Sequence, residues 1–293
     1  MFKIANLRNS LAGTPGGIIA LLLWSCYPPV MVYAKGINPF LCAGVLDGVA
    51  FIVFFALQAR SRQNPFSGLK SLPAWVVVSA IAGIGGHEVA LAAAFQSAPP
   101  LEVTFLNYMW PLFLLTFSAA MSRKAVGAGT VAAAGLGFGG MFILLCGRGL
   151  SLMDVKLCYG HLWALISALA WSFFSITCCS RPQLAVFSIA FFVSAFLDFG
   201  IWLSFGETAN VQAGAVAILG IASVFFALAY FLWGFAMERG NSRFLSIVSF
   251  STPVLSAVYL IVLGQAQFNA QIVIALVCVV SAIGIARSTG KAA

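Results

Sequence analysis

Long apolar segments follow one another along the whole chain, and each is long enough to cross a lipid bilayer. About 20 apolar residues in a helix span the hydrocarbon core, and the 293-residue chain is 62% hydrophobic and 8% charged, with a mean hydropathy of +1.04. A soluble domain carries about 25% charged residues, so this composition excludes a water-facing surface. We therefore predict an all-α integral membrane protein with ten transmembrane helices, numbered here as spans 1 to 10. The spans cover about 14–34, 39–58, 73–96, 99–121, 127–146, 160–180, 184–205, 211–237, 241–263 and 268–286.

The basic residues indicate how the spans are oriented. If both termini lie in the cytoplasm, all but three of the 15 lysines and arginines fall on the cytoplasmic side, the exceptions being Lys35, Arg148 and Lys156. Such a bias follows the positive-inside rule for multi-pass proteins. It also accounts for much of the net charge of +8, so no nucleic acid partner is expected. The basic N-terminus leads into span 1 without an A-x-A cleavage site, which predicts a retained span rather than a signal peptide.

The chain contains a weak internal repeat. Trp24-Ser25 of span 1 matches Trp171-Ser172 of span 6, and a shift of 142 residues aligns span 4 with span 9 without a gap. Five spans in each half, residues 1–150 and 151–293, bring the second half into the membrane from the opposite side, so we predict two inverted repeats. Chance similarity between apolar segments is the alternative. The aligned pairs of spans 4 and 9 are Thr104 with Ser246, Asn107 with Ser249, and Pro111 with Pro253.

With two five-helix halves, a tryptophan in spans 1 and 6, and prolines in spans 4 and 9, the chain resembles the drug/metabolite transporter superfamily over almost its whole length. Within that superfamily it is most similar to the EamA-like ten-helix exporters of the YddG type, which export aromatic amino acids. The resemblance implies that spans 1–4 and 6–9 surround a central cavity, with spans 5 and 10 outside them as supports. It also implies export by alternating access across a bacterial inner membrane.

Prolines interrupt several spans and change their backbone hydrogen bonding. A proline cannot donate to the carbonyl four residues before it, so Pro111 frees the carbonyl of Asn107 and Pro253 frees that of Ser249. A freed carbonyl inside a membrane needs another partner. The recurrence in both halves favours a binding site, while a simple bend of each helix is the alternative. The four prolines predicted to kink or hinge the helices are Pro28, Pro29, Pro111 and Pro253.

Placing an ionisable side chain inside a span costs free energy, so each one calls for a structural or functional explanation. His87 and Glu88 lie in the middle of span 3, where His87 belongs to a stripe of small residues that permits close helix packing or leaves space for a ligand. Because histidine titrates near neutral pH, we predict His87, and after it Glu88, as the proton-coupling residues. Asp47 in span 2 and Asp198 in span 7 are either structural acids or a proton or substrate site, and no spacing decides between the two.

Aromatic and small polar residues predict the lining of the cavity. Tryptophan and tyrosine carry both a ring and a polar group, and those deep in the membrane suit a substrate with an apolar ring and a small polar head. For Trp163, near the outer end of span 6, an interfacial belt is the alternative. The predicted substrate-binding residues are Trp24, His87, Asn107, Tyr108, Trp110, Trp163, Trp171, Tyr230, Ser246 and Ser249.

Several activities lack the residues that they need. No lysine or arginine is placed near mid-membrane, which argues against carriers of phosphorylated sugars. No GxxxxGK[ST] loop is present for ATP-driven pumping, and the HExxH motif begun by His87-Glu88 ends at Leu91. We therefore expect no catalytic residues, no metal and no cofactor, and a transporter rather than an enzyme.

The combined prediction is a secondary transporter that exports aromatic or other large neutral amino acids. The alternatives are an exporter of other small hydrophobic metabolites or cationic drugs, a channel, and an intramembrane enzyme. The expected partners are a small-molecule substrate and the lipid bilayer. The motifs Gly44-x-x-x-Gly48 and Gly135-x-x-x-Gly139 can pack helices within one subunit or between two, so a homodimer is a further predicted partner state.

Overall fold

The computed structural model describes residues 13–60, 72–123, 125–177, 184–206 and 213–290. Within these ranges every regular element is a helix, and ten helical stretches are long and apolar enough to cross a membrane. The predicted all-α fold with ten spans is confirmed. The basic N-terminus and the predicted span ends at 178–180 and 211–212 lie outside the described residues.

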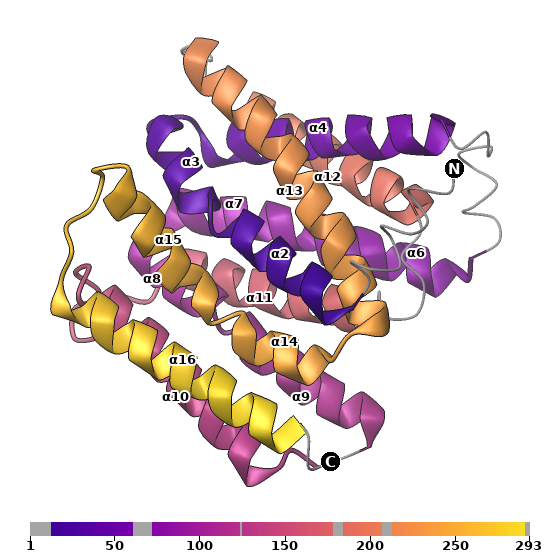
Figure 1. Ribbon diagram of the computed structural model, residues 1–293. Helices are drawn as coiled ribbons and strands as arrows, with labels where there is room; N and C mark the ends of the chain where they lie inside the picture. Colours follow the sequence, from indigo (N-terminus) through magenta and orange to yellow (C-terminus); the bar gives the residue numbers. More distant parts are fainter. Residues whose placement is uncertain (1–12, 61–71, 124, 178–183, 207–212, 291–293) are drawn as a thin grey trace.

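The first five spans include three that are interrupted (Figure 1). Two of the interruptions are followed by a proline in the first turn of the next helix, where the missing amide of proline costs no helical hydrogen bond. In chain order the elements are α2 (Thr14–Trp24) and α3 (Tyr27–Tyr33) in span 1, α4 (Pro39–Arg60) in span 2, α6 (Ala74–Ala80), the π-helical turn η1 (Ile81–Gly85) and α7 (Gly86–Ser97) in span 3, α8 (Pro100–Asn107) and α9 (Trp110–Ser122) in span 4, and α10 (Ala128–Cys146) in span 5.

The second five spans contain one interruption, in span 9, again just before a proline. The elements are α11 (Tyr159–Thr177) in span 6, α12 (Leu184–Ser204) in span 7, α13 (Ala213–Arg239) in span 8, α14 (Ser242–Val248) and α15 (Ser251–Val262) in span 9, and α16 (Ala270–Gly290) in span 10.

The helices pack in pairs that the two halves share. Helix α7 of span 3 packs against α11 of span 6, and α13 of span 8 packs against α2 of span 1, so exchanging the halves turns one contact into the other. The remaining large contacts, α4 with α12 and α10 with α16, each join equivalent spans. This is the pattern that two inverted repeats produce. The exact division into residues 1–150 and 151–293 stays a prediction.

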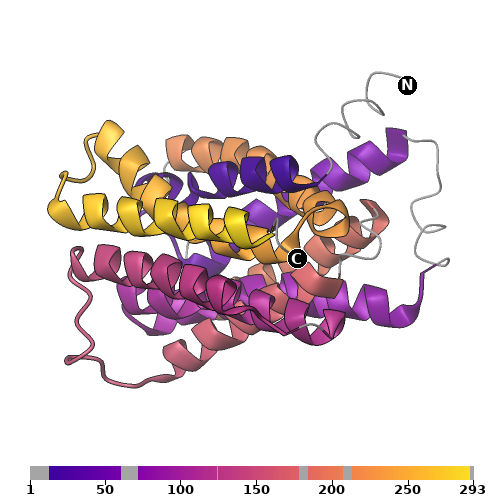
Figure 2. The same ribbon diagram turned by 60° about the horizontal axis from the view of Figure 1, so that its bottom comes forward.

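Spans 5 and 10 form a pair of their own. Helices α10 and α16 lie side by side at one edge of the molecule in both views (Figures 1 and 2). They approach closely at Gly140, where an added Cβ would lie 2.8 Å from the Cβ of Cys278. The other eight spans are left to surround the centre.

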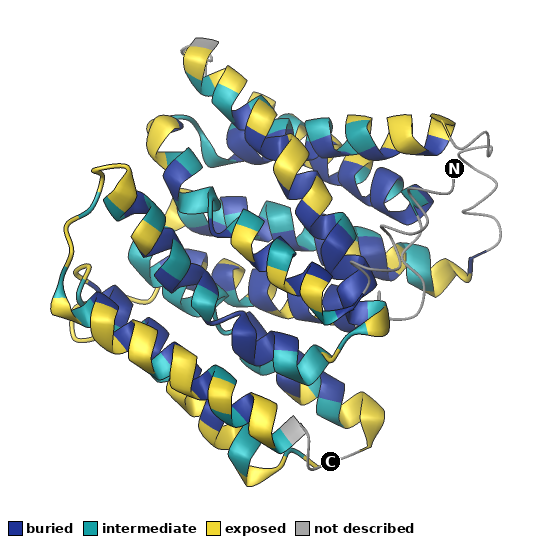
Figure 3. Ribbon diagram, in the orientation of Figure 1, coloured by how far each residue is buried: buried dark blue, intermediate teal, exposed yellow. Residues whose placement is uncertain are grey.

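The outer surface of the molecule is apolar, as lipid contact requires. Large apolar side chains face outward, such as Val78, 62% exposed, Val262, 79% exposed, and Phe196, 69% exposed. Figure 3 shows that exposed and buried positions alternate along most helices. The first glycine motif lies inside this packing, since a Cβ at Gly44 would lie 3.0 Å from the Phe199 ring of α12. At Gly135 and Gly139 an added Cβ would meet no atom within 4 Å.

Candidate functional site

Aromatic rings from both halves meet at the centre of the molecule. Trp24 of α2 and Trp171 of α11, which the repeat aligns, touch edge to face with ring centroids 5.2 Å apart. Tyr230 of α13 lies 5.3 Å from each of them, and Trp110 of α9 lies 6.1 Å from Trp171. Four of the predicted substrate-binding residues thus form one cluster, in edge-to-face arrangements that aromatic rings prefer.

Trp233 belongs to the same cluster, although it was not among the predicted lining. Its side chain is fully buried, with its ring 5.5 Å from Trp24 and 5.7 Å from Trp110. Its indole Nε1–H donates to Ser175 Oγ at 3.0 Å, as a buried indole needs. The sequence signal was its position three residues after Tyr230, on the same helical face.

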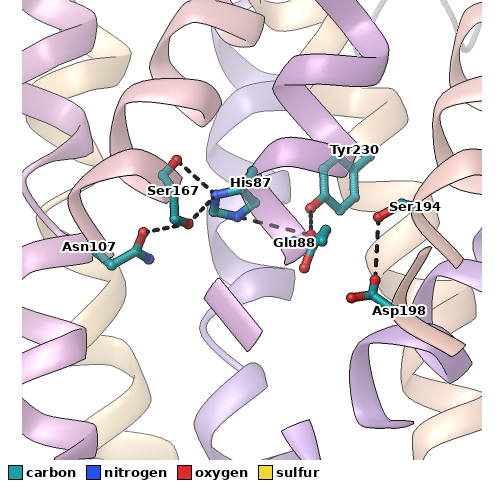
Figure 4. Close-up of polar contacts among 7 residues, drawn as sticks. All are labelled: His87, Glu88, Asn107, Ser167, Ser194, Asp198 and Tyr230. Carbon is teal, nitrogen blue, oxygen red and sulfur yellow. Dashed lines mark hydrogen bonds and ion pairs between the residues drawn. The ribbon is translucent and has the colours of Figure 1, made fainter. Parts of the chain in front are cut away.

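A chain of polar side chains crosses the molecule beside the rings (Figure 4). His87 Nδ1 lies 2.8 Å from Ser167 Oγ and 3.1 Å from the Ser167 carbonyl, and Ser167 Oγ donates to Asn107 Oδ1 at 3.2 Å. Because a carbonyl only accepts, the proton on the His87 ring must be carried by Nδ1. Ser167, which the sequence reasoning missed, precedes Trp171 by one helical turn.

The second ring nitrogen of His87, Nε2, faces Glu88, and the His87 ring lies beside the aromatic cluster. His87 Nε2 lies 4.0 Å from Glu88 Oε1, and the His87 ring lies 5.3 Å from the Trp171 ring. The hydroxyl of Tyr230 donates to Glu88 Oε1. With Nδ1 protonated, Nε2 is an acceptor whenever the ring is neutral, and it then faces the carboxylate of Glu88, a second acceptor, beside the rings.

The π-helical turn η1 precedes these two residues. Its Gly83 approaches α11 so closely that an added Cβ would lie 2.3 Å from the Cβ of Phe174. The small-residue stripe of span 3 therefore serves close packing at Gly83, while His87, one turn further on, reaches the polar chain. Single π-helical turns of this kind often occur at functional sites.

Comparison with known proteins finds similarity to a transporter family and to an exporter. Residues 11–146 match the EamA-like transporter family. The chain is 28% identical over 285 residues to the protein described as aromatic amino acid exporter YddG of Ancylobacter novellus, covering 92% of this chain and 95% of that protein. This chain is similar to EamA-like transporters. A solved structure titled only as the crystal structure of a protein superposes with a TM-score of 0.84 at 26% identity, covering 95% of this chain and 97% of that one.

The predicted resemblance to the drug/metabolite transporter superfamily, and to its YddG-type members, is confirmed. The described residues contain ten apolar spans, as in a multi-pass membrane protein. The family model and the relative are described as a transporter family and an exporter. The bilayer is the partner that follows from the apolar spans, and a small-molecule substrate stays a prediction. Among the described residues, no three His, Cys, Asp or Glu side chains are grouped so that they could hold a metal ion.

Not all predicted site residues join the central cluster. Tyr108 packs toward α10, beside Met141 and Leu145. Trp163 is 42% exposed near the start of α11, where an aromatic ring at the membrane interface is common. These two residues lie apart from the rings around Trp171.

The serines of span 9 are occupied by their own helix. Ser246 Oγ donates to the Ser242 carbonyl at 2.8 Å, and Ser249 Oγ donates to the Leu245 carbonyl at 2.7 Å. The carbonyl of Ser249, which Pro253 frees, accepts from the amide of Thr252 at 3.1 Å. The proline therefore produces a tight turn between α14 and α15 in which that carbonyl already has a partner.

Serine hydroxyls tie the interrupted spans to their neighbours. Ser172 Oγ of span 6 donates to the Trp110 carbonyl in span 4 at 2.8 Å. Ser256 Oγ of span 9 donates to the Ser25 carbonyl in span 1 at 2.8 Å. The interruptions of spans 4 and 1 are thus each held against a span of the other half.

A second ionisable pair lies away from the cluster, where spans 4 and 6 begin. His161 Nε2 lies 2.6 Å from Glu102 Oε2, and the amide of Cys158 donates to His161 Nδ1 at 3.0 Å. Since Nδ1 accepts, the proton on Nε2 is donated to Glu102. The sequence reasoning placed Glu102 at a span edge but did not connect it with His161, because the two are 59 residues apart.

Proposed function

We propose that this chain exports aromatic or other large neutral amino acids across the bacterial inner membrane by alternating access, with both termini in the cytoplasm. The support comes from its similarity to a protein described as an aromatic amino acid exporter. It also comes from a buried aromatic cluster with polar groups at one side.

The observation that carries the proposal is the pair of acceptors at His87 and Glu88. His87 Nε2 and Glu88 Oε1 are 4.0 Å apart, and neither can donate to the other while the imidazole is neutral and the carboxyl is ionised. The α-ammonium group of an amino acid carries three donors and a positive charge. Bound between the two, it would satisfy both acceptors, and a charge-assisted bond of this kind is stronger than a neutral one.

The rest of the substrate fits the surrounding groups. Trp24, Trp171 and Tyr230 lie within ring-contact distance of one another beside Glu88, so a substrate ring entering between them would exchange one aromatic contact for another. Asn107 accepts from Ser167 through Oδ1, which leaves its amide group as a donor for the substrate carboxylate. The site thus offers separate partners for ring, ammonium and carboxylate.

Transport requires the central rings to separate. Trp171 is 4% exposed and Tyr230 is 8% exposed, so a substrate reaches them only after the halves rearrange. The interruptions before Pro28-Pro29, Pro111 and Pro253 supply weak points for that movement. In this scheme the four prolines act as hinges, and His87 with Glu88 connects proton binding to the movement.

The test is flux into proteoliposomes that hold the purified chain. Labelled tryptophan, phenylalanine, lysine and a quaternary amine would be compared, with and without a pH gradient. We expect saturable flux of the two aromatic amino acids, stimulated by unlabelled phenylalanine on the opposite side, and little flux of lysine. Aromatic flux no greater than in empty liposomes would overturn the proposal.

One alternative has a specific observation in its favour. A partly buried carboxylate beside aromatic rings, as at Glu88, also suits an organic cation, through charge and cation–π attraction. Robust flux of the quaternary amine without flux of phenylalanine would establish that function instead. A channel would pass the aromatic pair without saturation or countertransport.

The oligomeric state is a separate part of the proposal. The open faces of Gly135 and Gly139 on α10 leave room for a second copy of the chain. Light scattering of the detergent-solubilised protein would give a dimer mass if two copies associate. Gly139→Leu should then lower the measured mass to that of a monomer. A monomer mass for the wild-type protein would overturn the proposed homodimer.

A further inference from the structure

Two aspartates meet where spans 2 and 7 pack against each other. Asp47 of α4 is 2% exposed and Asp198 of α12 is fully buried, and these two helices form one of the largest contacts in the fold. Their side chains lie within hydrogen-bonding range of each other, and Ser194 Oγ donates to Asp198 Oδ2 at 3.5 Å. Placing two carboxyl groups together inside apolar helices is costly unless something binds them.

One oxygen of each aspartate lacks a donor among the described residues. Asp47 Oδ2 and Asp198 Oδ1 are buried and receive no hydrogen bond from the described residues. Two ionised carboxylates both accept, so they can bond to each other only through a proton that one of them carries. One proton would satisfy both orphan oxygens and would remove the repulsion between two like charges.

Among the described residues, no cation takes the place of that proton. The ionisable groups that interact with the pair are Glu88 of α7, Tyr27 of α3 and Tyr230 of α13, all of them acids. The ion pairs of the described chain involve His87, His161 and Arg239, and none of these reaches Asp47 or Asp198. The surroundings are therefore negative or neutral, which favours binding of a positive charge.

Glu88 connects the aspartate pair to the proposed substrate site. It receives the hydrogen bond of Tyr230 and faces His87, and its charge acts on both aspartates. In Figure 4, Asp198 and Ser194 lie on one side of Glu88, and Ser167 and Asn107 lie on the other. An ammonium group at Glu88 would therefore be closer to the aspartates than a carboxylate at Asn107.

We propose that Asp47 and Asp198 form a proton-binding site that is emptied when the substrate ammonium binds at Glu88. This inference rests on the proposed function, because it takes the substrate to be an amino acid. The ammonium brings a positive charge beside the acids, the proton shared by the aspartates leaves to water, and the total charge of the site is unchanged. When the substrate leaves, a proton returns. Proton and amino acid then occupy the carrier alternately, so each amino acid is exchanged for one proton.

The test measures proton release directly. Purified wild-type protein in a weakly buffered detergent solution with a pH dye would be mixed with phenylalanine, and binding would be followed by tryptophan fluorescence. We expect close to one proton released per phenylalanine bound. By linkage, the dissociation constant of phenylalanine should fall by up to about tenfold per unit rise in pH over the range in which the pair titrates.

Isosteric variants locate the site. In Asp47→Asn and Asp198→Asn, phenylalanine should still bind, with proton release lowered at least fivefold and with an affinity that no longer depends on pH. Asp154→Asn, in an exposed loop, is the matched control and should behave as the wild type. If neither variant folds, Ser194→Ala, which removes the donor to Asp198 Oδ2, locates the site instead, because it should shift the pH range over which the phenylalanine affinity changes. An unshifted range would overturn the assignment.

The outcomes separate the two proposals. Binding of phenylalanine without proton release, or release that persists in both aspartate variants, would overturn the proton site and leave the proposed function standing. Binding that needs sodium and releases no proton would also overturn it. An absence of both phenylalanine binding and phenylalanine flux would instead be a failure of the proposed function.

Discussion

Spans 3 and 8 occupy equivalent places in the two halves, yet they are built differently. Glu88 and Tyr230 are 142 residues apart, the same shift that aligns spans 4 and 9, and they hydrogen-bond to each other where the halves meet. Span 8 is one continuous helix, α13, from Ala213 to Arg239. Span 3 is divided by the glycine-containing turn η1 just before His87 and Glu88.

The difference shows how a symmetric frame holds an asymmetric site. Span 3 contributes a histidine and a carboxylate, whereas the matching turn of span 8 contributes Tyr230 and, one turn later, Trp233. Residues that the repeat aligns can touch each other only near the axis that relates the halves. Groups of different chemistry at such positions give one polar side and one aromatic side to a single site, which a substrate with a ring and a charged head requires.

The largest expected effect tests the aromatic side, at Trp233. Replacing a fully buried tryptophan by alanine leaves a cavity and removes the bond to Ser175, so Trp233→Ala should lower the free energy of unfolding by about 3–5 kcal/mol. Denaturation of the detergent-solubilised protein would measure it. Trp163→Ala, at a ring 42% exposed, should cost less than about 1 kcal/mol. Equal losses of unfolding free energy in the two variants would contradict close packing around Trp233.

The next effect tests the polar side, at Glu88. Hydrogen bonds to charged groups contribute about 1.5–3 kcal/mol, so Glu88→Gln should weaken phenylalanine binding about 10- to 100-fold. Titration of tryptophan fluorescence would give the dissociation constants. Glu238→Gln, whose carboxylate forms an ion pair with the neighbouring Arg239 at the end of span 8, should leave them unchanged. An unchanged dissociation constant in Glu88→Gln would show that the ammonium group of phenylalanine does not bind at Glu88.

The π-helical turn can be tested with two glycines of span 3. Gly83→Ala would place a Cβ 2.3 Å from the Cβ of Phe174 and should cost about 1–3 kcal/mol of stability through overpacking. Gly86→Ala meets its nearest atom, the Cβ of Ala170, at 3.9 Å, so it should be neutral or stabilising. Thermal unfolding of both variants would measure the difference. Equal stability of the two would show that close approach of span 3 to span 6 is not what Gly83 provides.

The smallest expected effect tests the hydrogen bond between the aligned residues Glu88 and Tyr230. Tyr230→Phe keeps the ring and removes only the hydroxyl that donates to Glu88, so phenylalanine binding should change by about 1 kcal/mol, or roughly fivefold. In Tyr259→Phe of span 9, whose hydroxyl is remote from Glu88, the same measurement should show no change. A loss in Tyr230→Phe as large as in Glu88→Gln would mean that the hydroxyl itself contacts the substrate.

Much of the frame follows from the sequence because a bilayer leaves few alternatives. Inside lipid every backbone group must be bonded within its own segment, so a run of about 20 apolar residues predicts a helix with little ambiguity. The pairing of Trp24 with Trp171 was visible as a repeat, and the prolines predicted interruptions in spans 1, 4 and 9. The π-helical turn of span 3 was missed, because glycines in a membrane helix also serve ordinary close packing.

The polar partners could be decided only by the tertiary structure. Tyr230 meets Glu88, Ser167 bridges His87 to Asn107, and Asp47 faces Asp198. Each of these contacts joins residues far apart in sequence, and helical periodicity tells which side of its own helix a residue occupies, but not which helix lies opposite. The sequence determined that polar groups are buried in lipid-spanning helices. Only the packing of one helix against another determined which of them contact each other.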